Sequence, residues 1–285
     1  MKVALTDLDS MLHIVAYKQW KAGNRDNKEI VKSHIRRFIS TIEKNSGCTH
    51  SLRFFQTLGH TNYRKEILPE YKSHRKSTEW VKHWKPAIVE AFDDMGAIAL
   101  STIESDDAVS IIGREIGLDD VVVISSDKDM KQMACTQYDP FNAHKGKVND
   151  PRRWVHVTPS FADTFLWQQV LSGDSGDMPN ELCGIEGVGE VIAHKNLIMN
   201  NIPYKETVQK MYSEKYGSEK GFKRANLTYK MVRILDGTEP YLNVPAKTEI
   251  DLLLKIYKPL IQEITSDISN LFKKEQTDVS TLFNK

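Results

Sequence analysis

Cysteine is scarce in this chain of 285 residues, which contains three, at Cys48, Cys135 and Cys183. An odd number of widely spaced cysteines without a C-x-x-C pair indicates neither a disulfide framework nor a cysteine-based zinc site. Long hydrophobic runs are also missing, since the longest, such as residues 121–124, have only a few members. We therefore expect no membrane-spanning segment and no membrane partner.

Other broad features are those of an ordinary soluble globular protein, with 40% hydrophobic and 27% charged residues. The first ten residues, MKVALTDLDS, meet a charge at Asp7 too early for a secretory signal peptide. The length allows one large domain or two modest ones. We expect a cytosolic protein.

The net charge of +1 conceals two basic regions. Residues 64–85 hold seven Lys or Arg against three Glu, and residues 205–233 hold eight basic against three acidic residues. Basic regions that flank an acidic centre suit a polyanionic substrate held near metal ions. Taken singly, each run is more typical of a solvated face.

Short apolar strand patterns alternate with helical patterns over about the first 170 residues. Residues 2–7 and 121–127 are typical of buried strands in a parallel sheet, and residues 50–58 are a weaker candidate. Residues 29–44 have apolar side chains at helical spacing, and PAIVEAFDDMG predicts a helix that begins at Pro86. The alternation predicts an α/β fold with a mostly parallel sheet flanked by helices.

Nine carboxylates form four clusters near the ends of the predicted elements. They are Asp7 and Asp9; Glu104, Asp106 and Asp107; Asp127 and Asp129; and Asp174 and Asp177. Each cluster alone fits a turn or a helix cap, but nine carboxylates cannot share one crevice as bare anions. Oxygen ligands without clustered His or Cys favour Mg²⁺ or Mn²⁺. Two such ions suit displacement at a phosphodiester.

Two further stretches point to nucleic acid. GIEGVGEVIAHK places Gly184, Gly187 and Gly189 before a helix, where backbone N–H groups can approach a phosphate. NYRKEILPEYKSHRK interleaves Tyr63 and Tyr71 with Lys and Arg, a pattern that supports base stacking and phosphate contacts. The alternatives are an ordinary glycine-rich connection and a solvated surface loop.

In chain order, TDLDS, LPEYKSHR, IESDDA, SSDKDM and GDSGD…GIEGVG resemble the motifs of the bacteriophage and bacterial 5′-nuclease family, the flap endonuclease and 5′–3′ exonuclease group. The resemblance runs from Asp7 to about Lys195. It implies a PIN-like catalytic domain over residues 1–170, with a short arch around 64–86. It also implies a helix-two-turn-helix DNA-binding region and C-terminal helices over residues 171–285.

The resemblance further implies two Mg²⁺ (or Mn²⁺) ions held by carboxylates. The residues are Asp7, Glu104 and Asp106 for the first ion; Asp106, Asp127, Asp129 and Asp174 for the second; and Asp107 and Asp177 to complete the shell. The family usually has an Asp after its second strand, where this chain reads FFQTLGH, with Gln56 or Thr57 in that region. We therefore expect a more weakly bound first ion, with help from Asp9.

Roles beyond metal binding follow from the same resemblance. The catalytic residues would be Asp7, Asp106, Lys72 and Arg75, the last two approaching the scissile phosphate from the base of the arch. The DNA-binding residues would be Tyr71, Lys76, Gly187, Gly189 and Lys195. Family members often bind K⁺ at the glycine turn. The Lys common just after that turn is absent, and Lys195 lies one helical turn further along.

Together these features predict a Mg²⁺-dependent, structure-selective 5′-nuclease, acting as a 5′–3′ exonuclease, a flap endonuclease or both. Its substrate would be DNA with a 5′ end or flap on a duplex, or an RNA–DNA hybrid. We expect a monomer in the cytoplasm of a bacterial or phage-infected bacterial cell. One alternative is a haloacid-dehalogenase-type phosphatase with Asp7 as covalent nucleophile, in which the cluster at Glu104 has no role. The other is a catalytically silent DNA-binding module.

Overall fold

The computed structural model describes residues 2–23, 27–141, 153–200 and 202–283, without the side chains of 264–265 and 267–283. In this part of the chain, a six-stranded sheet has the order β3-β2-β1-β4-β5-β6. The strands are β1 (Val3–Asp7), β2 (His50–Gln56), β3 (Ile98–Leu100), β4 (Val121–Ile124), β5 (Thr136–Tyr138) and β6 (Trp154–His156). All neighbours pair in parallel except β5 and β6, which are antiparallel. The predicted α/β fold with a mostly parallel sheet is confirmed.

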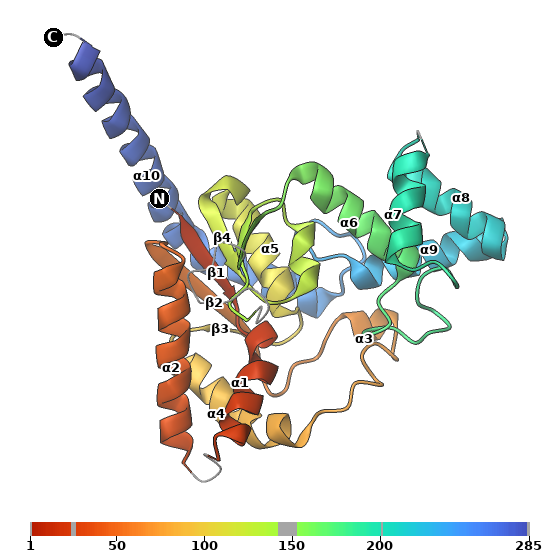
Figure 1. Cartoon of the computed structure of the whole chain (residues 1–285), viewed down its shortest axis with the longest axis horizontal. Helices are drawn as coiled ribbons and strands as arrows, with labels where there is room; N and C mark the ends of the chain where they lie inside the picture. Colours follow the sequence, from red (N-terminus) through yellow and green to blue (C-terminus); the bar gives the residue numbers. More distant parts are fainter. Residues whose placement is uncertain (1, 24–26, 142–152, 201, 284–285) are drawn as a thin grey trace.

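Helices cover both faces of the sheet (Figure 1). One face carries α1 (Asp9–Lys21), α2 (Lys28–Asn45) and α4 (Glu79–Asp94), and the other carries α5 (Ser105–Ile116) and the first part of α10 (Val244–Phe283). Successive side chains of a strand point to opposite faces. Accordingly, Ala4 packs in the hydrophobic core on the side of α1, α2 and α4, while Val3 and Leu5 pack in the core on the side of α5 and α10. With both faces buried, β1 is apolar from Val3 to Leu5.

Helix α4 begins at Glu79, so the prediction that a helix starts at Pro86 is wrong. The cause lies in the residues that precede the proline. Val81 and Trp84 are 5% and 1% exposed and continue the buried face of the helix toward its N-terminus. Pro86 itself is exposed on the opposite side. The packing of this face offsets the backbone hydrogen bond that the proline cannot make.

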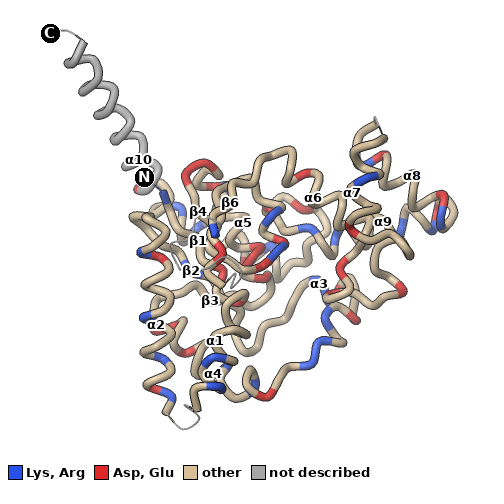
Figure 2. Tube along the Cα trace, in the orientation of Figure 1, with Lys and Arg blue, Asp and Glu red and all other residues tan. Residues whose placement is uncertain are grey.

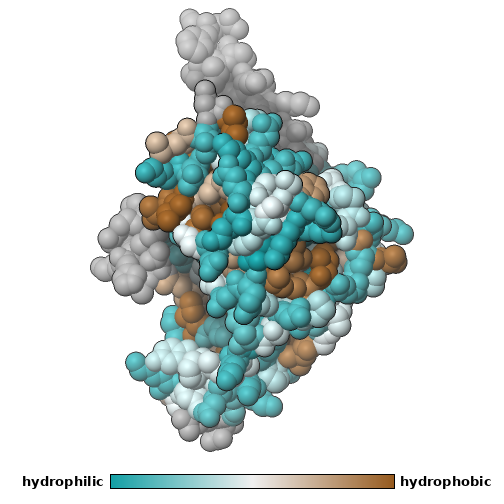
Figure 3. Space-filling model, turned by 90° about the vertical axis from the view of Figure 1, so that its right-hand side faces the viewer, coloured by the Kyte–Doolittle hydropathy of each residue, from teal (hydrophilic) through white to brown (hydrophobic). Residues whose placement is uncertain are grey.

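A separate hydrophobic cluster joins four helices beyond the sheet. They are α6 (Pro159–Ser172), α7 (Glu190–Met199), α8 (Tyr204–Tyr216) and α9 (Ser218–Val232). The hydroxyl of Tyr212 donates to the carbonyl of Val170 at 2.7 Å and so ties α8 to α6. A Cβ at Gly221 would lie 2.5 Å from the Tyr212 carbonyl oxygen, so glycine allows α9 to approach α8. The side of the molecule where α8 lies is mainly hydrophilic, with separate apolar patches (Figure 3).

The segment between α3 (Arg64–Ile67) and α4 connects these two parts of the molecule (Figure 1). Leu68 and Tyr71 pack with Met178 and Met231 in a small hydrophobic cluster. The next residue, Lys72, has a positive φ of 56°, which is uncommon for a side chain with a Cβ. Its backbone N–H donates to the Asp177 carbonyl at 2.8 Å, which helps to hold this conformation.

In the described part of the chain, no helix combines the length and the apolar character that crossing a bilayer requires.

Candidate active site

Two adjoining cavities open where β1 and β4 end. Their volumes are about 670 and about 400 Å³. Eight of the nine predicted carboxylates line one cavity or both, namely Asp7, Asp9, Glu104, Asp106, Asp127, Asp129, Asp174 and Asp177. The clusters therefore do converge, although they lie up to 170 positions apart (Asp7 to Asp177). Lys72 and Arg75 line both cavities and lie between them.

Asp7 is 2% exposed and is held by three serines. Its Oδ2 accepts a hydrogen bond from the Ser125 hydroxyl at 2.8 Å. Its Oδ1 accepts from the Ser10 backbone N–H at 3.3 Å and from the Ser105 hydroxyl. Ser105 belongs to the motif IESDDA and Ser125 to SSDKDM, so both of these motifs help to hold the carboxylate of Asp7. The sequence analysis missed these serines, although both stand one or two positions before an Asp.

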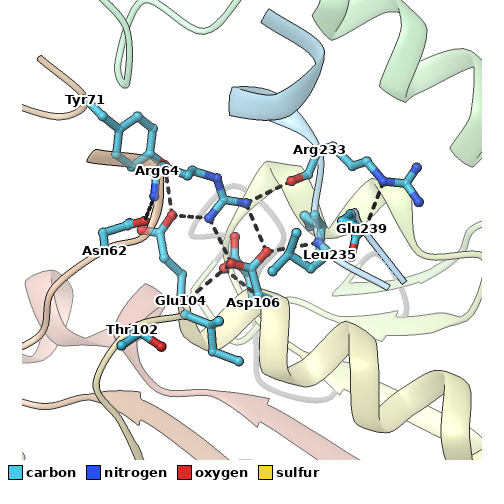
Figure 4. A network of polar contacts seen from close by, with 12 residues as sticks. Asn62, Arg64, Tyr71, Thr102, Glu104, Asp106, Arg233, Leu235 and Glu239 are labelled. Carbon is cyan, nitrogen blue, oxygen red and sulfur yellow. Dashed lines mark hydrogen bonds and ion pairs between the residues drawn. The ribbon is translucent and has the colours of Figure 1, made fainter. Parts of the chain in front are cut away.

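Arg64, 2% exposed, is the central cation of a buried network (Figure 4). Its Nη1 donates at 2.8 Å both to Glu104 Oε2 and to Asp107 Oδ2. Its Nη2 donates to Asp107 Oδ1 at 3.0 Å and to the Arg233 carbonyl at 2.8 Å. Both Nη groups are therefore engaged within the protein, which argues against the phosphate contact that the basic stretch suggested.

Asp107 is fully buried and lines neither cavity. Besides Arg64, its carboxylate accepts from the backbone N–H of Leu235 at 3.0 Å and from that of Glu104 at 3.3 Å. With Glu104 it forms the capping box that begins α5. Each oxygen thus already has two donors, and the carboxylate is enclosed by them. We assign it to holding Glu104 in place through Arg64.

Tyr71 is 1% exposed, and Tyr63 is equally buried. This burial corrects the expectation that these rings stack on nucleic-acid bases. The Tyr71 hydroxyl lies 2.8 Å from Glu104 Oε2 and 2.9 Å from Asp177 Oδ2. A hydroxyl has one proton to donate, so it cannot satisfy both carboxylates at once. The sequence pattern could not show that this tyrosine faces the acidic centre.

The two predicted catalytic cations are paired with carboxylates of the site. Lys72 Nζ forms an ion pair with Glu104 and lies 3.6 Å from Asp177 Oδ2. Arg75 forms an ion pair with Asp177, and its Nε donates to the Gly176 carbonyl at 2.7 Å. Both side chains are partly accessible from the cavities, so a phosphate could contact them.

Asp127, Asp129 and Asp174 line the smaller cavity together. Lys128 Nζ lies 3.0 Å from Asp174 Oδ2. Asp127 Oδ1 accepts from the Asp129 backbone N–H at 2.9 Å, which fixes the turn after β4. Asp129 Oδ1 accepts from the side-chain amide of Gln169 at 2.6 Å. Gln169, on α6, has no motif around it, and the sequence analysis missed it.

Gln56, in the region where the family usually has an Asp, lies at the end of β2 and faces the site. Its backbone N–H donates to Asp9 Oδ2 at 3.0 Å. Its side-chain amide lies 3.4 Å from Glu104 Oε1. A neutral amide thus replaces one negative charge here, and Asp9 lies next to it in the larger cavity. The role of Asp9 in holding the first ion stays a prediction.

Burial and neighbouring carboxylates raise the pKa values of Asp106 and Asp129. Burial, and then the charges of Asp107 and Glu104, raise the pKa of Asp106 well above its usual range. Burial and the neighbouring Asp127 raise the pKa of Asp129 to about 7. A bound cation would relieve both effects. The ligand atoms of Glu104, Asp106 and Asp107 lie within 4.8 Å of one another, and oxygen-only donors fit a hard divalent ion.

Glu104 and Asp9 show opposite shifts. Burial would raise the pKa of Glu104, but Lys72 and Arg64 outweigh it and hold this pKa well below its usual range. For Asp9, burial and the charge of Asp7 raise the pKa to about 7. The site therefore holds one strongly acidic carboxylate beside others that take up protons near neutral pH.

Apart from the buried Tyr71, the predicted DNA-binding residues lie on exposed surfaces. Lys76 lines the larger cavity, and Lys and Arg residues are spaced along the segment between α3 and α4 (Figure 2). Gly187 has a positive φ of 83° and open space where a Cβ would point. Gly189 is the N-cap of α7, and Lys195 is exposed on the same helix. The turn is anchored by Arg224, whose Nε donates to the Gly184 carbonyl at 3.1 Å.

Comparisons with known proteins agree with this architecture. The sequence model of the 5′-3′ exonuclease, N-terminal resolvase-like domain, matches residues 2–156. A structure of T5 5′-exonuclease with divalent zinc ions bound has a TM-score of 0.57 at 17% identity, covering 95% of this chain and 99% of that chain. T5 D15 protein co-crystallised with metal ions has a TM-score of 0.55 at 17% identity, with the same coverage. A lysine-to-alanine mutant of T5 5′-exonuclease has a TM-score of 0.54 at 15% identity, covering 94% and 98%.

At these identities the structural similarity shows the fold alone. Among curated protein sequences, none matches this chain.

Removing the buried guanidinium should strongly destabilise the protein. Arg64→Met retains much of the side-chain volume but leaves Glu104 and Asp107 without their shared cation. We expect the free energy of unfolding to fall by about 3–5 kcal/mol, as when one partner of a buried ion pair is removed. Urea unfolding followed by circular dichroism measures this loss. Lys65→Met, at the exposed neighbouring position, is the control, and an equal effect of both variants would contradict the role of Arg64.

The raised pKa values predict that the metal-free protein loses stability as the pH rises. The folded state holds protons on Asp9 and Asp129 up to about pH 7, whereas the unfolded chain releases them near 3.8. Between these values the folded state binds more protons, so the unfolding free energy falls with increasing pH. The pKa values of His13 and His60, lowered by burial, act in the opposite direction below about pH 6.5, and the lowered pKa of Glu104 does so at more acidic pH.

We therefore expect the Tm in EDTA to decrease from about pH 5 to about pH 8. Asp129→Asn should flatten this decrease, whereas Asp93→Asn, an exposed position on α4, should leave it unchanged. Differential scanning calorimetry provides the measurement. The same slope in Asp129→Asn as in the unmodified protein would show that the pKa of Asp129 is not raised.

Proposed function

The chain belongs to the 5′–3′ exonuclease family and is a nuclease, and from this premise we propose that it cleaves DNA at or near 5′ ends with two divalent metal ions. One observation carries the proposal: eight carboxylates line two adjoining cavities, with Lys72 and Arg75 between them. An acidic centre for cations beside cations for a phosphate suits phosphodiester hydrolysis. Family membership sets aside the phosphatase alternative and the catalytically silent module.

The proposed ions are Mg²⁺, since the ligands are hard oxygens. The similar structure of T5 5′-exonuclease has divalent metal ions bound, in that case zinc. The proposed ligands, with Asp107 left out because it is enclosed, are Asp7, Glu104 and Asp106 for one ion and Asp106, Asp127, Asp129 and Asp174 for the other. When bound, such ions lower the pKa of a water and offset charge on the phosphate oxygens.

Lys72 and Arg75 are proposed to act on the phosphate itself. Each pairs with a carboxylate that also lines the cavities, Glu104 for Lys72 and Asp177 for Arg75. The Lys72 backbone, anchored to the Asp177 carbonyl, points this ammonium into the site. A preorganised cation stabilises charge that develops in the transition state more than charge already present in the bound substrate.

Binding of duplex DNA is assigned to the outer surfaces. The proposed contacts are Lys76 beside the larger cavity and the turn at Gly187 and Gly189, followed by Lys195. Open space around Gly187 supports close approach of a phosphate to its backbone N–H. Action on a 5′ flap or an RNA–DNA hybrid, K⁺ at the turn and a monomeric state stay predictions.

Cleavage assays with metal-site variants test the proposal. We expect Asp127→Asn and Asp174→Asn each to lower cleavage by at least about 100-fold, because each removes a metal ligand. DNA affinity should be unchanged or higher, since negative charge leaves the path of the phosphates. The substrates are 5′-labelled blunt, nicked, flapped and circular single-stranded DNA, with Mg²⁺ or EDTA. Asp93→Asn is the matched control, and cleavage at the normal rate by Asp127→Asn, or in EDTA, would refute the metal assignment.

Single-turnover kinetics separates catalysis from binding at Lys72 and Arg75. Alanine at either position should lower the cleavage rate at saturating enzyme by about 100-fold, with a much smaller change in Kd. Lys82→Ala, at an exposed position on α4, should mainly change the affinity and its salt dependence. If Lys72→Ala behaved like Lys82→Ala and altered only the Kd, its role at the scissile phosphate would be wrong.

A further inference from the structure

Two buried glutamines connect Asp129 to the end of α9. Gln169 on α6 is 5% exposed, and Gln132, at the end of the short helix η2 (Lys128–Gln132), is 9% exposed. The Gln169 amide donates from Nε2 to Asp129 Oδ1 at 2.6 Å. The Gln132 amide donates from Nε2 to Gln169 Oε1 at 2.7 Å. Three side chains therefore form a continuous hydrogen-bonded row.

Backbone contacts determine which way both amides point. Gln132 Oε1 accepts from the Ile234 backbone N–H at 3.0 Å, and Gln132 Nε2 donates to the Val232 carbonyl at 2.7 Å. A backbone N–H can only donate, so the oxygen of Gln132 must face Ile234 and its NH₂ group must face Gln169. Gln169 in turn must accept through its oxygen and direct its own NH₂ group at Asp129. Each amide therefore donates toward Asp129, and the last donor, Gln169 Nε2, bonds to the Asp129 carboxylate.

We propose that Gln169 is a positioning residue for the metal site at Asp129, oriented by Gln132 and the start of the connection between α9 and α10. The inference rests on the proposed function, in which Asp129 holds an ion. A donor on Oδ1 fixes the rotamer of Asp129 and leaves Oδ2 for a cation. Hydrogen-bonded partners of metal ligands commonly contribute 10- to 100-fold in metal affinity.

The same connection also anchors the other metal ligands. Arg64, which holds Glu104, donates to the Arg233 carbonyl, and Asp107 accepts from the Leu235 backbone N–H. Residues 232–235 are therefore bonded to supports of both proposed ions. The same short backbone segment at the end of α9 therefore supports the proposed ligands of both ions.

Manganese titration without DNA tests the role of Gln169. Electron paramagnetic resonance of free Mn²⁺ gives the number of bound ions and their Kd values. In Gln169→Leu, we expect the Kd of one ion to rise about tenfold and that of the other to stay within about twofold. Cleavage by this variant should recover toward the unmodified rate at high Mn²⁺, a rescue that a general packing defect would not show. Gln168→Leu, at the neighbouring half-buried position, is the matched control.

Unchanged Kd values in a folded Gln169→Leu protein would overturn the inference while leaving the proposed function intact. If the unmodified protein bound no Mn²⁺, the proposed function would fail and the inference with it. Thermal unfolding checks whether the variant folds. If the variant does not fold, the test is instead made on the unmodified protein, by NMR of its side-chain amide ¹⁵N resonances. Addition of Mg²⁺ should then shift the Gln169 signal and not that of Gln168, and a shift in neither, with ions bound, would overturn the role.

Discussion

The buried guanidinium of Arg64 is the interaction on which the metal site depends. It joins three distant parts of the chain: α3, the start of α5, and the connection after α9. Without this cation, Glu104 and Asp107 would be two anions side by side in a region of low dielectric, which is strongly unfavourable. With it, the charge of Asp107 is neutralised in the interior, and Glu104 is held where it lines the cavities. The geometry of the site is thus determined by a residue that does not line the larger cavity.

Charge balance explains the arrangement around that pair. In the structure, Lys72, Arg75 and Lys128 pair with carboxylates. Asp106 and Asp129 have raised pKa values because they are buried and lie beside other carboxylates. Under the proposed function, bound cations supply the missing charge. The ion pairs of Lys72 and Arg75 with these carboxylates would then be weaker, so both cations could contact a phosphate. The same two side chains can therefore stabilise the metal-free fold and act on the substrate.

Local patterns in the sequence predicted β1, β2 and β4 and the acidic centre, because apolar runs define β1 and β4 and two of the acidic motifs follow directly at their ends. The short strands β3, β5 and β6 were not predicted. The supporting residues could not be found in this way. Arg64 lies in a basic stretch that resembles a phosphate-binding loop, and its partners are 40 to 169 positions away. Gln169 is an ordinary polar residue in a helix until Asp129 is placed beside it. Such roles depend on tertiary contacts that have no signal in the neighbouring residues.

Asp106 and Asp107 are adjacent and chemically identical, yet they have different surroundings in the structure. Adjacent residues of a helix point in directions about 100° apart, so their side chains can have different surroundings. Asp106 lines both cavities, whereas Asp107 turns inward to Arg64 and to the Leu235 N–H. The family resemblance assigned both to the metal site, because the position of the buried cation cannot be seen from the sequence. Once Arg64 is placed, only Asp106 can hold an ion without breaking the network that positions Glu104.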